Sequence, residues 1–215
     1  MSIIIERFNK IKSNISNTGI KGTKIVAVSK TFTLDHIMPL IQYGHDHFGE
    51  NKVQEAEAKW SEIKKAKTKL KLHMIGKLQS NKAKKAIEVF DYIHSLDNQK
   101  LADNLSKFQI SLNKSVSYFI QVNIGNEVQK SGIPYHEVDA FYNYCTMEKK
   151  MNVIGLMAIP PNDGKTDQYF KSLSELNLSL GLKELSMGMS SDYMKALNYK
   201  TTFLRLGSSI FGDRS

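Results

Sequence analysis

Short apolar runs alternate along the chain with longer stretches in which apolar residues recur at helical spacing. The short runs are typical of strands buried on both faces, and they lie at 24–30, 47–50, 71–76, 92–96, 117–124, 152–159, 184–189 and 202–207. The helical stretches lie between them, at 34–43, 51–66, 80–89, 98–110, 135–148, 166–179 and 192–199. The pattern therefore predicts strands and helices in strict alternation.

Eight such units predict an α/β fold, a (β/α)8 TIM barrel. The amphipathic stretch "MSIIIERFNKIKSNI" before the first strand predicts an extra N-terminal helix. The chain has 215 residues, 41% of them apolar, and no long linker or low-complexity segment, so we expect one domain over residues 1–215. A doubly wound open sheet is the alternative, because one strand more or fewer would fit that fold.

The formal net charge of +9 raises the question of a nucleic-acid partner. All but three of the 30 basic residues are lysines, and they are scattered along the whole chain. No zinc-finger spacing, aromatic RNA-binding signature or glycine-rich phosphate loop accompanies them. We therefore expect a solvated, lysine-rich surface and no nucleic-acid partner.

Membrane, secreted and metal-binding classes also find little support in the sequence. The longest apolar runs are far shorter than the roughly 18 residues that a membrane span needs. The N-terminal stretch lacks the basic region and the cleavage site of a signal peptide, so we expect a cytoplasmic protein without membrane association. His45 and His47 in "GHDHF" have no third ligand at a supporting spacing, so we expect no metal.

Polar residues gather where the predicted strands end, which is where the active sites of such barrels lie. Lys30 shares a strand face with Val26 and Val28, and Arg205 shares one with Phe203. Asn51 follows the second strand, in "GEN". The last two strands end in "GMSSD" and "GSS", whose hydroxyl and backbone N–H groups suit a phosphate.

A lysine, an arginine and a phosphate cradle at one barrel mouth fit a cofactor that combines an aldehyde with a phosphate. Pyridoxal 5′-phosphate (PLP) is such a cofactor, and Lys30 would hold it as a Schiff base. Two other interpretations remain open on spacing alone. Sugar-phosphate aldolases also combine a Schiff-base lysine with a phosphate site, and a lysine at a strand end can simply extend to solvent.

Several short motifs occur together and in order along the chain, and they point to one family. The motifs are "AVSKT", "FGEN" with "VQE", "HMIGKLQSNK", "IHSLD", "QVNIG" with "KSG", "GLMAIP", "LSMGMSSD" and "RLGSSIFG". Together they resemble the YggS/PROSC family of pyridoxal phosphate homeostasis proteins. The resemblance implies a fold type III PLP-binding barrel, similar to the N-terminal domain of alanine racemase.

The resemblance also implies roles for individual residues. It implies that Lys30 forms the Schiff base and that Arg205 faces the pyridine nitrogen of the cofactor. The phosphate-binding positions match Ser190, Gly207 and Ser208, and the pocket-lining positions match Asn51, Ile75 and Met157. A charged guanidinium beside the ring nitrogen opposes its protonation, which weakens the ring as an electron sink.

The family implies a role in vitamin B6 homeostasis, in which PLP is buffered or delivered to apo-enzymes that it meets transiently. We expect a monomer without robust turnover and therefore no catalytic residue. The alternative is a PLP-dependent enzyme similar to an amino-acid racemase, which needs a second acid or base on the opposite face of the substrate. In alanine racemases a tyrosine of an additional C-terminal domain supplies it. This sequence ends at Ser215, soon after the last predicted strand, and none of its tyrosines is a clear replacement.

Overall fold

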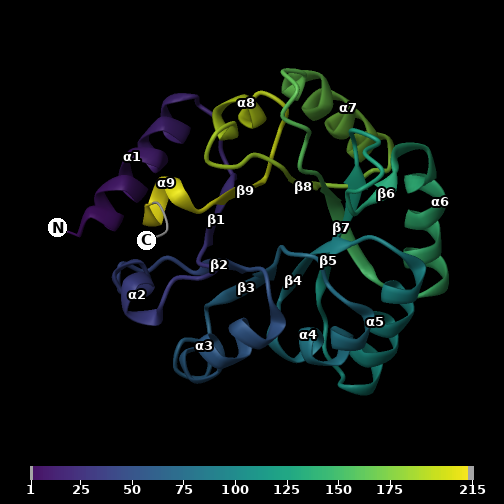
Figure 1. Ribbon diagram of the computed structural model, residues 1–215, viewed down its shortest axis with the longest axis horizontal. Coiled ribbons are helices and arrows are strands. Elements are labelled where there is room, and N and C mark those ends of the chain that lie inside the picture. The colour runs from purple at the N-terminus through teal and green to yellow at the C-terminus, as the bar shows by residue number, and fades with distance from the viewer. Residues whose placement is uncertain (1, 213–215) are drawn as a thin grey trace.

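Parallel strands close into a barrel at the centre of the computed structural model (Figure 1), which describes residues 2–212. Within these residues, eight strands form the ring: β1 (Lys24–Val28), β2 (His47–Glu50), β3 (Lys71–Met74), β4 (Tyr92–Leu96), β5 (Ser117–Asn123), β7 (Asn152–Met157), β8 (Glu184–Ser186) and β9 (Phe203–Leu206). β9 pairs with β1, and β4 pairs with β5, so the sheet has no open edge within the ring. The predicted barrel is confirmed, and the open sheet is wrong. Met1 and residues 213–215, which the domain prediction includes, lie outside the described residues.

The strand predictions differ from the structure mainly at the carboxyl ends. The runs predicted to end at 30, 159 and 189 leave the sheet earlier, at Val28, Met157 and Ser186. The residues beyond these points form the loops at the barrel mouth, so the apolar pattern continues where the strand ladder has ended. The structure adds one strand that the pattern did not predict, the two-residue β6 (Ile133–Pro134), which pairs with β5 outside the ring.

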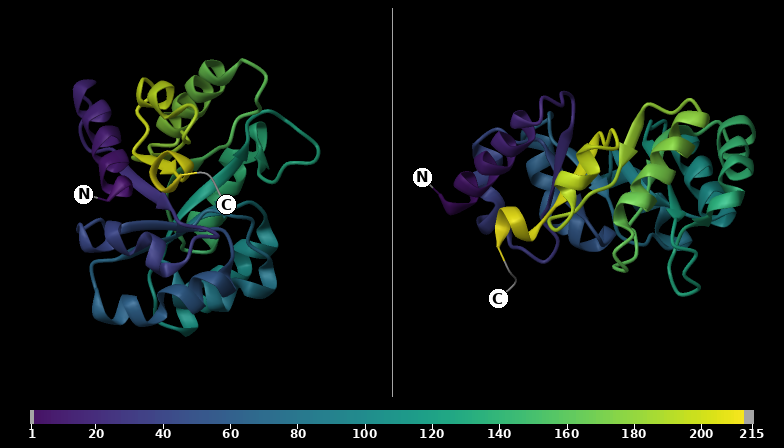
Figure 2. Two further views of the ribbon diagram at one scale, coloured as in Figure 1. Left: turned by 60° about the vertical axis from the view of Figure 1, so that its left-hand side comes forward. Right: turned by 90° about the horizontal axis from the view of Figure 1, so that it is seen from above.

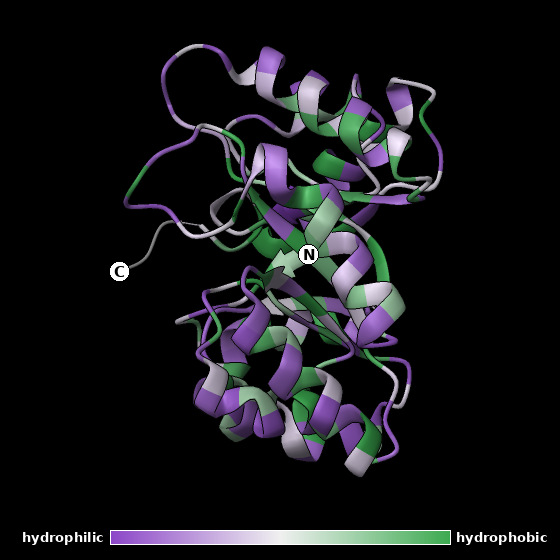
Figure 3. Ribbon diagram, turned by 90° about the vertical axis from the view of Figure 1, so that its right-hand side faces the viewer, coloured by the Kyte–Doolittle hydropathy of each residue, from purple (hydrophilic) through white to green (hydrophobic). Residues whose placement is uncertain are grey.

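Helices surround the barrel and turn their hydrophobic faces toward it (Figure 3). They are α1 (Ile3–Asn17), α2 (Leu34–Gln42), α3 (Val53–Ala66), α4 (Ala83–Val89), α5 (Gln99–Ser111), α6 (Val138–Asn143), α7 (Thr166–Ser179), α8 (Tyr193–Leu197) and α9 (Ser208–Phe211). Short 3-10 segments precede α4 and α6, and a π-helical segment (Tyr144–Glu148) follows α6. The helix predicted over 135–148 is therefore three joined segments of different pitch.

The extra N-terminal helix completes the outer layer. The last helix, α9, has only four residues, too few to cover the strands beside it. In Figure 1, α1 lies next to α9 and near α2. Its buried side chains recur at helical spacing: Ile4, Ile5, Phe8, Ile11 and Ile15. α1 thus takes the position that a longer eighth helix would occupy.

The barrel interior has its own small core, separate from the larger one between strands and helices. Val26, Phe119, Met157 and Phe203 form this inner apolar cluster. Two buried histidines, His73 on β3 and His94 on β4, pack against this cluster. Figure 2 shows that the loops after β5 and β7 project from the same face of the molecule as α9, which is the carboxyl-end face of the strands. None of the helices in residues 2–212 is long and apolar enough to cross a membrane.

Candidate functional site

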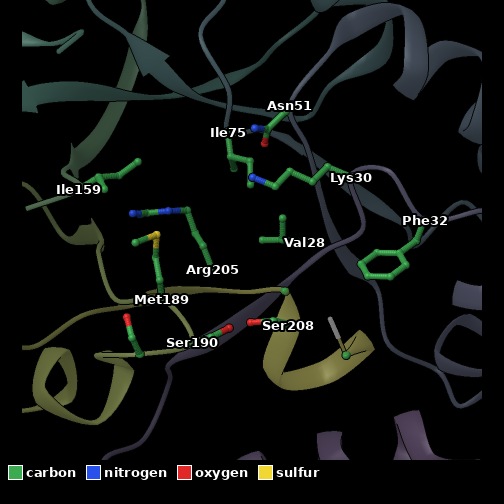
Figure 4. Close-up of a pocket in the computed structure, with 13 residues that line it drawn as sticks. Val28, Lys30, Phe32, Asn51, Ile75, Ile159, Met189, Ser190, Arg205 and Ser208 are labelled. Atoms are coloured by element: carbon green, nitrogen blue, oxygen red, sulfur yellow. The ribbon is translucent and has the colours of Figure 1, made fainter. Parts of the chain in front are cut away.

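A cavity of about 560 Å³ opens at the carboxyl ends of the strands (Figure 4). Its wall is formed by residues from the ends of several strands and from the loops that follow them. These residues are Val28, Lys30, Phe32, Asn51, Ile75, Ile159, Met189, Ser190, Ser191, Arg205, Gly207, Ser208 and Gly212. The volume lies within the range of small-molecule sites, about 300–1,000 Å³. This cavity is the candidate functional site.

The structure brings most of the residues predicted from the sequence into this one cavity. Its wall contains Lys30, Asn51, Ile75, Ser190, Arg205, Gly207 and Ser208. Met157 is the exception, because it is fully buried in the inner apolar cluster and does not line the cavity. Ile159, two residues further along, lines it instead. Met157 thus lies one layer deeper in the barrel than the cavity wall.

Lys30 lies two residues beyond β1 and continues the alternation of that strand. Val26 belongs to the inner cluster, whereas Val28 and Lys30 line the cavity above it. Figure 4 shows the Lys30 side chain extending into the cavity. The shared face predicted for these three residues is confirmed. The amine is thereby placed over an apolar floor rather than on the outer surface.

The residues on either side of Lys30 are fixed by side chains from β2 and α3. The Ser29 hydroxyl donates to Glu50 Oε1 at 2.8 Å, and Lys59 Nζ donates to the Ser29 carbonyl at 2.9 Å. The Thr31 N–H donates to Glu55 Oε1 at 2.7 Å. Thr31 has a φ of 68°, which is a strained conformation for a β-branched residue. The chain therefore holds a strained turn immediately after Lys30.

Glu50 is the centre of this charged cluster, which we define as Glu50, Glu55, Lys59 and Trp60. Glu50 is fully buried, and its Oε1 accepts hydrogen bonds from Lys59 Nζ and Trp60 Nε1, each at 2.9 Å. Its other oxygen, Oε2, has no hydrogen-bond partner in the described part of the chain. Burial alone would raise the pKa of Glu55, but the Thr31 N–H and Lys59 lower it below its usual value. Glu55 is therefore ionised at neutral pH.

Arg205 approaches the cavity from β9 and is almost fully buried, at 4% exposure. Its Nη1 donates to the Ser186 hydroxyl at 2.6 Å, and its Nη2 donates to the Ala158 carbonyl at 2.9 Å. Burial lowers the pKa of Arg205 to about 10, so the guanidinium keeps its charge at neutral pH. In Figure 4 its guanidinium points into the cavity that Lys30 also enters.

Hydroxyl groups gather on one side of the cavity. Figure 4 places Ser190 and Ser208 there, opposite Asn51 and Ile75. Ser190 Oγ donates to Ser209 Oγ at 3.1 Å and accepts from the Ser209 N–H at 3.3 Å. These serines join the loop after β8 to the start of α9. They form the hydroxyl group cluster that the motifs "GMSSD" and "GSS" predicted.

Two glycines shape this side of the cavity. Gly188 has a φ of +92°, and a Cβ there would lie 2.7 Å from Ala196 Cβ, so the turn before Ser190 needs glycine. A Cβ on Gly207 would have the Val28 carbonyl oxygen, at 3.4 Å, as its nearest neighbour. The protein itself thus has room for a side chain at Gly207. The missing side chain leaves that space to the cavity.

Sequence reasoning did not assign six of the lining residues to the site: Val28, Phe32, Ile159, Met189, Ser191 and Gly212. Val28 and Ile159 share strand faces with recognised residues at period two, and Met189 and Ser191 flank Ser190, so each carried a usable signal. Phe32 and Gly212 lie in loops, where periodicity gives no information. Among residues 2–212, no three His, Cys, Asp or Glu side chains are grouped to hold a metal ion.

Comparison with known proteins agrees with this barrel. The family model of the alanine racemase N-terminal domain matches residues 4–215, so the barrel is of that class. The pyridoxal phosphate homeostasis protein of Aquifex aeolicus is 33% identical, over 100% of this chain and 96% of the relative. The protein of the same name from Pasteurella multocida is 36% identical, over 90% of this chain and 87% of the relative. The chain therefore belongs to the pyridoxal phosphate homeostasis protein family, as its motifs predicted.

Solved structures similar to this barrel support the same assignment. The chain is similar to PipY of Synechococcus elongatus without PLP, with a TM-score of 0.88 and 35% identity over 97% of this chain and 100% of PipY. PipY with PLP bound gives a TM-score of 0.87 and 34% identity over the same shares of the two chains. The barrel described here is thus closely similar to both forms of PipY.

Proposed function

We propose that this chain binds pyridoxal 5′-phosphate in the cavity through Lys30 and serves vitamin B6 homeostasis by storing or delivering the cofactor. The observation that carries the proposal is the meeting of the Lys30 amine, the Arg205 guanidinium and the serine hydroxyls in one cavity. The names of the relatives support the homeostatic role, and the PLP bound to PipY supports the ligand.

The residues present fit the cofactor in size and in chemistry. The cofactor supplies an aldehyde that condenses reversibly with a lysine amine and releases one water. The phosphate would fit beside Ser190, Ser208 and Gly207. The two hydroxyl groups can donate hydrogen bonds to an anion, and Gly207 leaves space for it. Asn51 and Ile75 would contact the ring from the opposite side of the cavity.

Arg205 would face the ring nitrogen and keep it unprotonated. Its charge persists at neutral pH, and two hydrogen bonds fix its direction. An unprotonated ring is a weak electron sink, which suits retention of the cofactor better than carbanion chemistry. We therefore propose binding without robust turnover, and with it transient contact with apo-enzymes. The monomeric state and the cytoplasmic location stay predictions from the sequence.

The test is the visible absorption spectrum of the purified protein with added PLP, followed by borohydride reduction and intact-mass analysis. The wild type is expected to develop an absorption band and to gain the mass of one reduced pyridoxyl phosphate group at Lys30. Lys30→Ala is expected to lose both signals. Lys52→Ala is the matched control, because Lys52 is an exposed lysine next to Asn51, and it should behave as wild type. An unmodified wild type would contradict the proposal.

Turnover is tested separately on the same preparations. Racemisation of a panel of amino acids by the PLP-loaded wild type is expected to stay at the level of Lys30→Ala. Transfer of the cofactor to an apo-enzyme, measured by recovery of that enzyme's activity, is expected to be faster than from free lysine adducts. Racemisation that depends on Lys30 would instead favour the enzyme alternative.

A further inference from the structure

A chain of hydrogen bonds runs through the barrel interior and ends at Arg205. His47 Nδ1 and His73 Nε2 are 2.9 Å apart, and His73 Nδ1 and His94 Nε2 are also 2.9 Å apart. His94 Nδ1 lies 2.8 Å from Ser186 Oγ, which accepts from Arg205 Nη1 at 2.6 Å. We call His47, His73, His94 and Ser186 the histidine chain. Its members come from β2, β3, β4 and β8, so it crosses the barrel.

Aromatic neighbours hold the histidine rings in place. The His73 ring is stacked on Tyr92, with centroids 4.3 Å apart and planes 4° apart. The His94 ring is stacked on Phe119, with centroids 4.3 Å apart and planes 21° apart. Both histidines are fully buried. Packed rings of this kind keep their nitrogens aligned, so the hydrogen-bond chain is a fixed feature of the interior.

The buried imidazoles of the chain are neutral. Burial lowers the pKa of His73 well below its usual value, and the neighbouring His94 lowers it further. Burial and the charge of Arg205 do the same to the pKa of His94. A neutral imidazole carries one N–H and one acceptor nitrogen. Each ring must therefore donate in one direction and accept from the other.

Two directions are possible, and the ends of the chain select one. Arg205 can only donate, so Ser186 Oγ must accept from it. In the described part of the chain, the other hydrogen-bond partner of Ser186 Oγ is His94 Nδ1, so the Ser186 hydroxyl has an acceptor only if His94 Nδ1 is unprotonated. At the far end, His47 Nε2 lies 3.8 Å from Asp46 Oδ1, which favours an N–H at that nitrogen. Both ends of the chain therefore favour the same direction, in which each O–H or N–H group of the chain donates away from Arg205.

We propose that His47, His73 and His94 all carry their proton on Nε2, and that Ser186 and His94 thereby act as positioning residues for Arg205. The inference rests on the proposed function in one respect, namely that Arg205 faces the bound cofactor. Ser186 presents a lone pair to the guanidinium because its own hydrogen is taken by His94. His94 can accept that hydrogen because His73 accepts from it in turn.

The tautomers can be tested directly on the protein without added PLP. Nitrogen-15 NMR of the histidine side chains distinguishes the two neutral tautomers and the charged ring. The expected result is the Nε2–H tautomer for His47, His73 and His94 at neutral pH, assigned by comparison with single His→Gln variants. An Nδ1–H tautomer or a charged ring at His73 or His94 would overturn the proposal, whether or not the protein binds PLP.

The positioning role is tested by changing Ser186. Ser186→Ala removes one of the two acceptors of Arg205, and PLP affinity is expected to fall about tenfold, as loss of a hydrogen bond to a charged group does. The absorption band of the bound cofactor is expected to shift, because the guanidinium no longer holds its direction. Ser186→Thr retains the hydroxyl and is expected to restore both the affinity and the band.

A matched control separates this effect from general damage to the barrel. The control is His45→Gln. His45 lies beside His47 but outside the histidine chain, because its Nε2 contacts the His47 carbonyl at 2.9 Å. This variant is expected to keep the wild-type band and affinity. If Ser186→Ala also keeps both, the positioning role is wrong while PLP binding stands. If the wild type itself binds no PLP, the proposed function fails, and the tautomer result still decides the histidine chain.

Discussion

Two polar networks lie next to the two basic residues of the cavity, and they differ in charge. The charged cluster beside Lys30 uses a buried carboxylate and an ammonium, whereas the histidine chain behind Arg205 uses neutral rings and a hydroxyl. Lys59 has a carboxylate at 2.9 Å, and Arg205 instead donates to a hydroxyl and a carbonyl. A buried charge needs either an opposite charge or several hydrogen bonds.

The difference has a consequence for the two basic residues of the site. A carboxylate beside Arg205 would neutralise its guanidinium and weaken its effect on a ring nitrogen. In the described part of the chain, Arg205 donates to neutral acceptors, which fix its direction without an ion pair to a carboxylate. The cluster beside Lys30 instead stabilises a strained backbone turn. Glu55 and Lys59 of α3 do this through hydrogen bonds to the backbone of Thr31 and Ser29. Charged side chains thus hold the backbone around Lys30, whereas neutral groups accept the hydrogen bonds of the Arg205 side chain.

The largest expected effect tests the charged cluster. Lys59→Met would leave the buried Glu50 side chain without its cation, and the free energy of unfolding is expected to fall by about 3 kcal/mol. Urea denaturation measures this change. Lys65→Met on the same helix is the control, because Lys65 and Glu62 form an exposed ion pair, and its change should stay within about 0.5 kcal/mol. Equal stability of Lys59→Met and wild type would show that Glu50 needs no cation.

The second prediction sharpens the contrast through pH. Burial lowers the pKa of His45 to about 4 and the pKa values of His73 and His94 well below the usual value. The unfolded chain therefore takes up protons first as pH falls. The contribution of these histidines to the free energy of unfolding is fully present above about pH 6.5. Below that pH it decreases by about 1.4 kcal/mol per pH unit for each histidine that stays neutral in the folded protein.

Urea denaturation between pH 7 and pH 5 measures this slope, and His73→Gln should make it shallower. Glu55 of the charged cluster responds in a different pH range. The pKa of Glu55 is lowered, so its contribution is present above its usual pKa and is lost only at more acidic pH. A flat stability profile from pH 7 to pH 5 would contradict neutral histidines in the folded barrel.

The smallest expected effect concerns the strained turn after Lys30. Thr31→Asn retains the N–H that Glu55 accepts and replaces a β-branched residue at positive φ with one that tolerates it. Stability is expected to rise by about 0.5 to 1 kcal/mol, with PLP loading unchanged. Thermal unfolding and the reduction assay measure the two quantities. A loss of stability would show that the Thr31 side chain contributes more than its backbone strain costs.

The sequence by itself determined the elements and much of the site. Period-two alternation placed Val26, Val28 and Lys30 on one face, because neighbouring side chains of a strand point to opposite sides wherever the strand lies. The same local rule placed Arg205 with Phe203, and the alternation of strands and helices predicted the barrel. These features depend on residues close together in the chain.

Only the tertiary structure decided how deep each residue lies and which distant residues meet. Met157 and Ile159 share a face, and the tilt and stagger of the strands put one in the inner core and the other in the cavity wall. The histidine chain depends on the register of β2 and β3, which pairs His47 with Lys71 and Gly49 with His73, so that the His47 and His73 rings meet on one face from positions two residues apart. Periodicity within one strand carries no information about its stagger against the next, since that stagger is fixed by closure of the whole barrel.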